Sequence, residues 1–232
     1  MPFLEHLREL RARLVKSAAA VAVGTVVSFV FFEDILAFLA APYHAAVPEG
    51  SLVFFTPTGG FSVAMSVSLW GGLVLASPVI LYQTWRFVSP ALTEKERRWA
   101  VPLTGVFVSL FLVGIVAGYY ALYRGIGFLI EFAGAQLTPV IGANDYLRFT
   151  MRFLLAFGLA FEFPVFLFAA AAFGIVTSRQ LAEFRRWAIV VILVIAAAIT
   201  PTGDPLTLSL LSIPMYLLYE AAIVAIRLVL RR

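Results

Sequence analysis

One carboxylate of this chain, Glu162, lies inside a long apolar segment, where an ionised side chain is costly. It is the only acidic residue of the segment Arg152–Thr177. About ten residues separate it from Arg152, which is roughly 15 Å along a helix. The residues one turn away, Gly158 and Phe166, cannot pair with it. A carboxylate at that depth is a functional candidate; the alternative is a protonated Glu162 hydrogen-bonded to another helix.

A second set of charged side chains lies in the N-terminal arm, ahead of the first apolar run. Apolar residues at positions 3, 7, 10 and 14 recur at spacings of three and four, which predicts a helix with one apolar stripe. The other face carries Glu9 one turn before Arg13. This face is either a surface on which glutamate and arginine pair with each other, or a recognition surface for a charged ligand.

A third candidate, Glu96, lies in a basic connection between two apolar runs. Pro90 should end the preceding helix. Thr93 then begins the next helix, and Glu96 completes a Thr-x-x-Glu capping box. Helix capping alone explains Glu96, but Glu96 could also bind a cationic ligand. The two roles are compatible, since a capping carboxylate keeps an oxygen for an incoming cation.

Enzyme chemistry finds little support in the sequence. The chain has no cysteine and two histidines, His6 and His44, neither of which lies in a long apolar run. An intramembrane serine protease needs a histidine base in a span and a nucleophile in a tight glycine-flanked turn, and neither pattern occurs. Phosphate-binding glycine loops and metal-ligand clusters are also missing. We therefore expect a protein that is not an enzyme and has no cofactor or metal.

The composition indicates that these groups belong to a membrane protein. The 232-residue chain is 62% hydrophobic and 13% charged, whereas soluble domains are about 45–50% apolar and about 25% charged. Mean hydropathy is +0.98. A soluble domain of this length cannot bury so many apolar side chains, so several membrane crossings are predicted. The net charge of +4 is expected at the membrane edges, and no nucleic acid is expected as a partner.

Six charge-poor runs define an all-α polytopic fold, in one membrane domain over residues 1–232. The predicted spans are approximately 15–33, 62–86, 99–123, 152–174, 185–200 and 206–226. The fifth is short, because its uncharged stretch Trp187–Ile199 covers about 20 Å against a hydrocarbon core of roughly 30 Å. The segment Phe132–Asn144 holds Gly and Pro residues and is predicted to be a loop.

The basic residues predict the orientation. Of the 17 Lys and Arg residues, all but Arg124, Arg148 and Arg152 lie in the two termini and in the second-to-third and fourth-to-fifth connections. Because basic residues stay in the cytoplasm, six spans with both termini cytoplasmic are predicted. Two outer loops are then long, about 28 residues each, and should have structure of their own. The last outer connection, Thr200–Pro205, should be a tight turn.

Six short motifs, in order along the chain, together resemble the TatC family, the polytopic subunit of the twin-arginine protein translocase. Each motif is weak alone, but six at matching places in a six-span frame are specific, and the resemblance covers essentially the whole chain. The motifs are His6-Leu7-x-Glu9-Leu10-Arg11-x-Arg13-Leu14, Ser77-Pro78-Val79-Ile80-Leu81-Tyr82-Gln83-x-Trp85-x-Phe87, Pro90-Ala91-Leu92 with Glu96-Arg97-Arg98, Phe161-Glu162-x-Pro164-Val165, Thr200-Pro201, and Ile213-Pro214-Met215-Tyr216.

The resemblance implies a function, partners and a location. TatC proteins act as signal-peptide receptor and core subunit, and they export folded proteins across the bacterial or archaeal cytoplasmic membrane, driven by the proton-motive force. The implied partners are twin-arginine signal peptides, single-span TatA- or TatB-type subunits, further copies of the chain and the lipid bilayer. The implied bundle is concave. A proton-coupled transporter of small solutes that uses Glu162 is the alternative function.

The resemblance also implies roles for residues. Carboxylates suit arginines because a guanidinium fork pairs with them bidentately, a geometry that lysine cannot copy. The family's turn, Thr-Pro-Pro-Asp, is one residue longer in this chain. Glu162 is implied to lie on the concave membrane face. The implied signal-peptide site is Glu9, Glu96, Phe87, Leu92, Arg11 and Arg13, and the implied outer-side or partner contacts are Pro42, Tyr120, Thr200 and Asp204.

Overall fold

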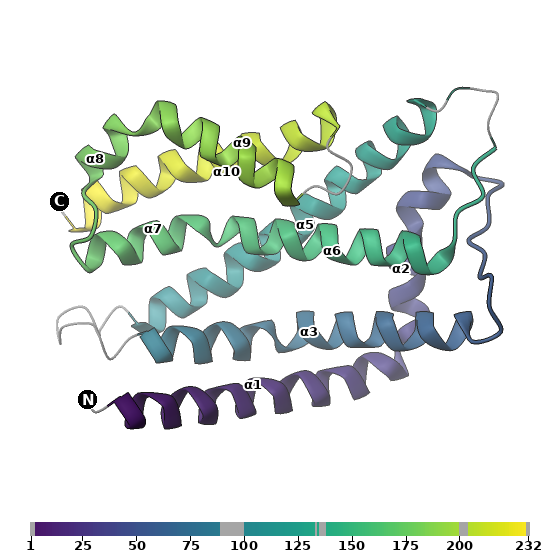
Figure 1. The fold of residues 1–232 in the computed structure, drawn as a ribbon, viewed down its shortest axis with the longest axis horizontal. Helices are drawn as coiled ribbons and strands as arrows, with labels where there is room; N and C mark the ends of the chain where they lie inside the picture. Colours follow the sequence, from purple (N-terminus) through teal and green to yellow (C-terminus); the bar gives the residue numbers. More distant parts are fainter. Residues whose placement is uncertain (1–2, 89–99, 133, 135–137, 200–203, 231–232) are drawn as a thin grey trace. The chain divides into compact units, whose positions relative to one another are not determined.

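The structure is a computed structural model that describes residues 3–88, 100–132, 134, 138–199 and 204–230. Its elements in these ranges are helices, apart from an isolated bridge between Val53 and Gly142. The predicted all-α fold is therefore confirmed (Figure 1). The helices are α1 (Phe3–Val30), α2 (Phe32–Ala46), α3 (Gly59–Val88), α5 (Ala100–Phe132), α6 (Ala143–Phe161), α7 (Phe163–Ala172), α8 (Ser178–Glu183), α9 (Arg185–Ile199), α10 (Pro205–Ala225) and the π-helix η2 (Ile226–Leu230).

Five helical segments in the described ranges are long and apolar enough to cross a membrane. Four are α1, α3, α5 and the joined pair α6–α7, and the fifth is α10 with η2. The predicted fifth span corresponds to α9, which has 15 residues and is as short as the sequence indicates. At 1.5 Å per residue it covers about 22 Å, less than a typical hydrocarbon core.

The chain divides into two compact units. The first comprises Met1–Val108 and Leu129–Met151, and the second comprises Ser109–Phe128 and Arg152–Arg232. The first unit thus holds α1, α2, α3, both ends of α5 and the start of α6. The second unit holds the middle of α5, the rest of α6 and all helices from α7 onward.

In the first unit, α1 and α3 lie side by side and run in opposite directions (Figure 1). Their backbones meet at Gly24 and Gly72, where a Cβ added to Gly24 would lie 2.7 Å from the Gly72 carbonyl oxygen. Close approach through small residues is how helices pack in membranes, where no hydrophobic driving force acts between them. This crossing fixes the register of α1 on α3.

The connection between α1 and α3 is structured, as predicted for the first long loop. It contains α2, which follows α1 after a bend at Phe31. The Tyr146 hydroxyl at the start of α6 donates to the Leu39 carbonyl at 2.9 Å. The Val53 and Gly142 bridge adds a second link between the same two connections.

In the second unit, α5 packs closely on α6. A Cβ on Gly114 would lie 2.7 Å from the Phe157 carbonyl oxygen, and one on Gly118 would lie 2.8 Å from the Phe157 Cβ. The chain turns after α7 at Gly174, whose φ is +74°. Ile175 N donates to Ala170 O at 2.9 Å, so glycine closes the helix with a Schellman-type turn.

Two helix ends differ from the bounds that the charges predict for the spans. Helix α5 continues past Arg124 to Phe132, and α6 begins at Ala143, ahead of Arg148 and Arg152. Charged side chains therefore lie on continuous helices rather than at their ends. The intervening segment retains non-helical residues at 134 and 138–142. The membrane bounds of the spans stay a prediction.

Candidate functional site

The end of the first unit where α1 begins and α3 ends carries a polar network, here called the charged end: His6, Glu9, Arg13, Gln83 and Phe87. The Arg13 guanidinium donates to Glu9 Oε1 through Nε at 3.1 Å and also through Nη2. Its Nη1 donates to Gln83 Oε1 on α3 at 3.2 Å. The side chains of Arg13 and Glu9 are 14% and 26% exposed. Arg13 thus joins an acid of its own helix to an amide of the neighbouring helix.

An aromatic contact forms beside this network. The His6 ring stacks on Phe87, with centroids 4.4 Å apart and an interplanar angle of 24°. One residue before Phe87, Arg86 donates to the Tyr82 hydroxyl at 3.2 Å. Phe87 thus contacts α1 through His6, one turn before Glu9.

The electrostatics of the charged end keep Glu9 ionised. The hydrogen bond from Arg13 holds the pKa of Glu9 below its usual value and outweighs desolvation, which acts in the opposite direction. The positive charges of Arg13, His6 and Arg86 add to this lowering. Both bonds from Arg13 go to Oε1, and neither uses Oε2. A second guanidinium can therefore approach the carboxylate without removing the first.

The remaining predicted members of the signal-peptide site are placed only in part. Arg11 is exposed on α1. Glu96 and Leu92 lie outside the described residues. The sequence indicated the Glu9 and Arg13 pair through its spacing of four, and the structure confirms it. The sequence did not indicate the contact of His6 with Phe87 or that of Arg13 with Gln83, because both depend on the register between α1 and α3.

Glu162 occupies the joint between α6 and α7. Helix α6 ends at Phe161 and α7 begins at Phe163, with Pro164 in its first turn. The Glu162 side chain is 1% exposed, and neither carboxylate oxygen has a hydrogen-bond partner in the described part of the chain. The hydrogen bond to another helix that we considered is thus not found there. A buried polar group without a partner costs roughly 1–3 kcal/mol, so Glu162 does not serve folding stability.

Two of the residues predicted for the outer side, Pro42 and Tyr120, lie on helices, and a third, Asp204, precedes one. Pro42 is buried inside α2. Tyr120 on α5 is 63% exposed, with the Arg124 guanidinium 5.9 Å from its ring centroid. Asp204 caps α10, because its carboxylate accepts from Thr207 N at 2.8 Å and also from the Thr207 hydroxyl. Thr200 lies outside the described residues.

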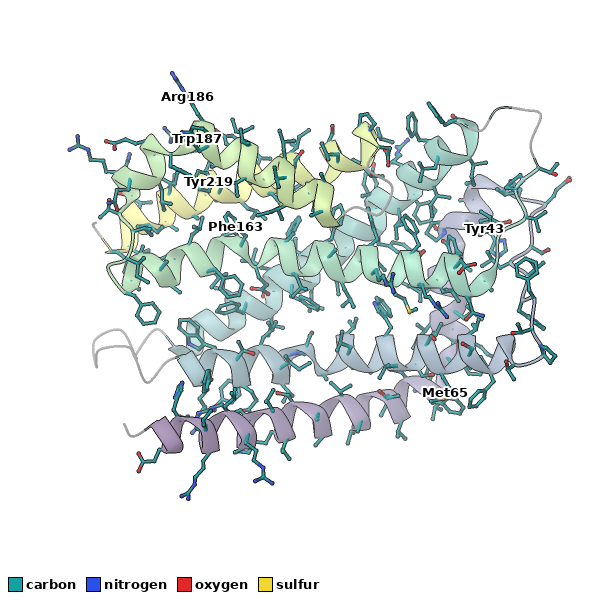
Figure 2. The ribbon with its side chains drawn as sticks, in the orientation of Figure 1. Tyr43, Met65, Phe163, Arg186, Trp187 and Tyr219 are labelled. Carbon is teal, nitrogen blue, oxygen red and sulfur yellow. The ribbon has the colours of Figure 1, made fainter. Side chains whose placement is uncertain are left out.

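The second unit contains an ion pair that the sequence did not indicate. Arg185 Nε and Nη2 donate to the two oxygens of Glu220 at 2.7 and 2.8 Å, and the Tyr216 hydroxyl donates to Oε1 at 3.1 Å. This bidentate pair fixes the first turn of α9 to α10. The next residues, Arg186 and Trp187, point outward (Figure 2). Arg185 and Glu220 are 35 positions apart, so only the fold reveals their contact.

The apolar helices define a multi-pass membrane protein with a charged helix end and, in the part of the chain that the structure describes, one buried acid. Residues 5–214 match the family model described as Sec-independent protein translocase protein (TatC). The chain belongs to the TatC family. The relative from Aquifex aeolicus is 39% identical, over 96% of this chain and 93% of its own length. The relative from Frankia casuarinae is also 39% identical, over 97% of this chain but 65% of its own length.

Solved structures agree with this assignment. A crystal structure of the twin-arginine translocase receptor TatC has a TM-score of 0.80 at 39% identity and covers 96% of this chain and 98% of its own. A second, in the detergent DDM, has a TM-score of 0.82 at 38% identity and covers 95% and 99%. The fold is therefore that of TatC over nearly the whole chain.

Proposed function

We propose that this chain is the signal-peptide receptor and core subunit of a twin-arginine translocase that exports folded proteins, driven by the proton-motive force. The charged end carries this proposal, because the partly exposed Glu9 carboxylate is bonded there to Arg13, which also bonds Gln83 of the neighbouring helix. The family and the name of the two related crystal structures support it. They favour protein translocation over the alternative of small-solute transport. Twin-arginine signal peptides and single-span TatA- or TatB-type subunits are the proposed partners.

The proposed recognition step uses two carboxylates, Glu9 and Glu96, for the paired arginines of the signal peptide. Phe87 and Leu92 supply apolar contacts to the residues around those arginines, and Arg11 and Arg13 orient the carboxylates. A charge-assisted bond at a partly desolvated site contributes roughly 1.5–3 kcal/mol, whereas a freely exposed pair gives only about 0.2–1 kcal/mol. The loss of signal-peptide affinity should therefore be measurable when either carboxylate is removed singly.

Signal-peptide affinity of the correctly inserted Glu96→Gln protein tests this recognition step. We expect at least about a tenfold loss, since 1.4 kcal/mol is one decade. Glutamine can still cap a helix in this box, so wild-type affinity would reduce Glu96 to a cap and overturn its receptor role. Glu94→Gln is the matched control, because it makes the same change two residues away and should bind normally.

The proposed topology has six spans, with α9 as the fifth, in the cytoplasmic membrane of a bacterium or archaeon and with both termini in the cytoplasm. The split of basic residues between the connections supports it. Single cysteines at Ala12, Lys95 and Arg232 should react only with reagents added from the cytoplasm. Cysteines at Glu49, Asn144 and Thr202 should react only from outside. Reversed labelling at position 232 alone would contradict the six-span count.

The other candidate residues are proposed to act after recognition. Glu162 is a polar group kept inside the membrane at a cost in stability, which fits a role in transport. The exposed ring of Tyr120 fits contact with a partner helix. Pro42, Thr200 and Asp204 are proposed to shape the outer connections that partner subunits and further copies of the chain contact.

A further inference from the structure

The first unit contains a cavity at the end of α3 opposite the charged end. Its volume is about 740 Å³. Helix α2, residues 51–54, the start of α3 and the start of α6 line it, and it is open on one side. Its lining residues are mostly apolar, and Glu33, His44 and Ser51 are its polar side chains. The cavity plays no part in the function proposed above.

Helical spacing gives the cavity two walls. Glu33, Leu36, Ala37, Ala40 and His44 line it from α2 at steps of three and four, so they form one face of that helix. Gly60, Val63 and Ala64 line it from the first turns of α3 in the same way.

The small side chains on α3 leave room along that helix. Since α3 continues from Gly59 as a membrane-spanning segment, the second wall leads from the membrane edge towards its interior. The cavity thus has polar side chains, among them Glu33 and His44, on α2, and an apolar surface along α3.

The cavity lies at a membrane edge. Helix α2 lies in the connection between the apolar run of α1, which ends at Val30, and that of α3, which begins at Gly59 (Figure 1). Phenylalanine rings around it are solvent-exposed, by 55% at Phe31, 60% at Phe54 and 69% at Phe61. Exposed phenylalanine rings at the end of a spanning helix form an apolar surface that suits contact with lipid. The occupant must therefore be available from the bilayer.

Charge defines the head group that this cavity suits. Residues 31–60 contain Glu33, Asp34 and Glu49 but no lysine or arginine. Glu33 is the only carboxylate among the lining residues. The phosphate that all phospholipids share finds no Lys or Arg side chain in this segment, so it does not distinguish one phospholipid from another, whereas an added ammonium group finds a carboxylate.

We propose that this cavity binds a membrane phospholipid with an ammonium head group, such as phosphatidylethanolamine. Glu33 accepts hydrogen bonds from the ammonium, and an acyl chain lies along Gly60, Val63 and Ala64 of α3. The apolar wall accounts for the requirement for a lipid rather than a free amine. The bound lipid would fix α2 to the start of α3. Tyr43, which also lies on α2, is already buried (Figure 2).

Native mass spectrometry of the full chain, released from nanodiscs of equal parts phosphatidylethanolamine and phosphatidylglycerol, tests the proposal. We expect retained phosphatidylethanolamine to exceed phosphatidylglycerol in the wild-type protein. Glu33→Gln should lower that ratio by about two- to fivefold, as expected for one partly exposed ion pair. Glu49→Gln removes a carboxylate from the same connection but not from the cavity, and should leave the ratio unchanged.

A second pair of variants tests the cavity itself. Ala37→Trp fills it from a solvent-exposed helix position, and should reduce the retained amount of both lipids. Ala45→Trp places the same side chain on α2 away from the cavity and should retain wild-type amounts. Equal retention of the two lipids by the wild type, or equal ratios in the wild type and Glu33→Gln, would overturn the ammonium site. Undiminished lipid in Ala37→Trp would overturn the cavity as its location.

Discussion

The charged end of the first unit and the interior of the second unit each present one glutamate, and their surroundings differ. Glu9 is partly exposed and accepts two hydrogen bonds from Arg13. Glu162 is 1% exposed and has no hydrogen-bond partner among the described residues. A partly exposed carboxylate that uses one oxygen for its guanidinium partner can accept another cation at the second oxygen, which suits recognition. A buried carboxylate without a partner lowers stability, so its presence requires a role other than folding.

The largest effect on stability and binding should come from separating α1 and α3, the two helices that carry the charged end. A Cβ at Gly72 would overlap the backbone nitrogen of Thr25, so Gly72→Leu must separate α1 from α3. We expect a loss of about 3 kcal/mol or more in the free energy of unfolding, and loss of signal-peptide binding. Equilibrium unfolding in mixed detergent micelles measures the first quantity.

Gly127→Leu is the matched control for that change, since no atom lies within 4 Å of a Cβ at Gly127 on α5. It should leave the free energy of unfolding nearly unchanged. Similar destabilisation by Gly72→Leu and Gly127→Leu would mean that leucine destabilises these helices at any position. The loss in Gly72→Leu could then not be attributed to the α1–α3 crossing.

An intermediate effect of opposite sign is expected at Glu162. Methionine has nearly the same volume and no polar group to leave without a partner, so Glu162→Met should raise the free energy of unfolding by about 1–3 kcal/mol. Transport by the same protein should fall. Unfolding in detergent and export of a folded reporter measure the two effects. A stabilised protein with normal export would show that Glu162 has no part in transport.

Glutamine and alanine at Glu162 sharpen this test. Glu162→Gln keeps an amide that can hydrogen-bond during transport, so it should export better than Glu162→Ala. Equal and complete loss in both variants would instead indicate that the acid itself carries a proton.

The smallest effect is expected at Glu9. Its charge is shared with Arg13 and is partly exposed, so Glu9→Gln should weaken signal-peptide binding by only about two- to fivefold. This is less than the loss expected for Glu96→Gln. Glu5→Gln, one turn earlier on the exposed face of α1, is the control and should bind normally. A loss at Glu9 as large as that at Glu96 would mean that Arg13 leaves the pair when the peptide binds.

Local features of the fold could be predicted from the sequence because they depend on neighbouring residues. The short uncharged stretch before Thr200 predicts the short α9. Glu9 and Arg13 lie four residues apart, which is enough to predict their ion pair. Each of these inferences needs only the geometry of a single helix.

Contacts between helices could not be predicted in the same way. The Arg13 bond to Gln83 requires the register that Gly24 and Gly72 impose on α1 and α3. Arg185 and Glu220 meet only because α9 folds back along α10. Charges such as Arg124 and Arg148 suggest where a span meets the membrane surface, but they do not mark the ends of helices, since α5 and α6 continue through them.

The crossing at Gly24 and Gly72 has a consequence for biosynthesis. Both glycines lie in the first third of the chain, and α1 packs chiefly against α3. The two helices can therefore dock in the membrane once residue 88 has left the ribosome, before α5 is complete. Since chains are made from the N-terminus at roughly 5–20 residues per second, this helical hairpin has several seconds to assemble. The rest of the protein is then inserted beside a pair that is already packed.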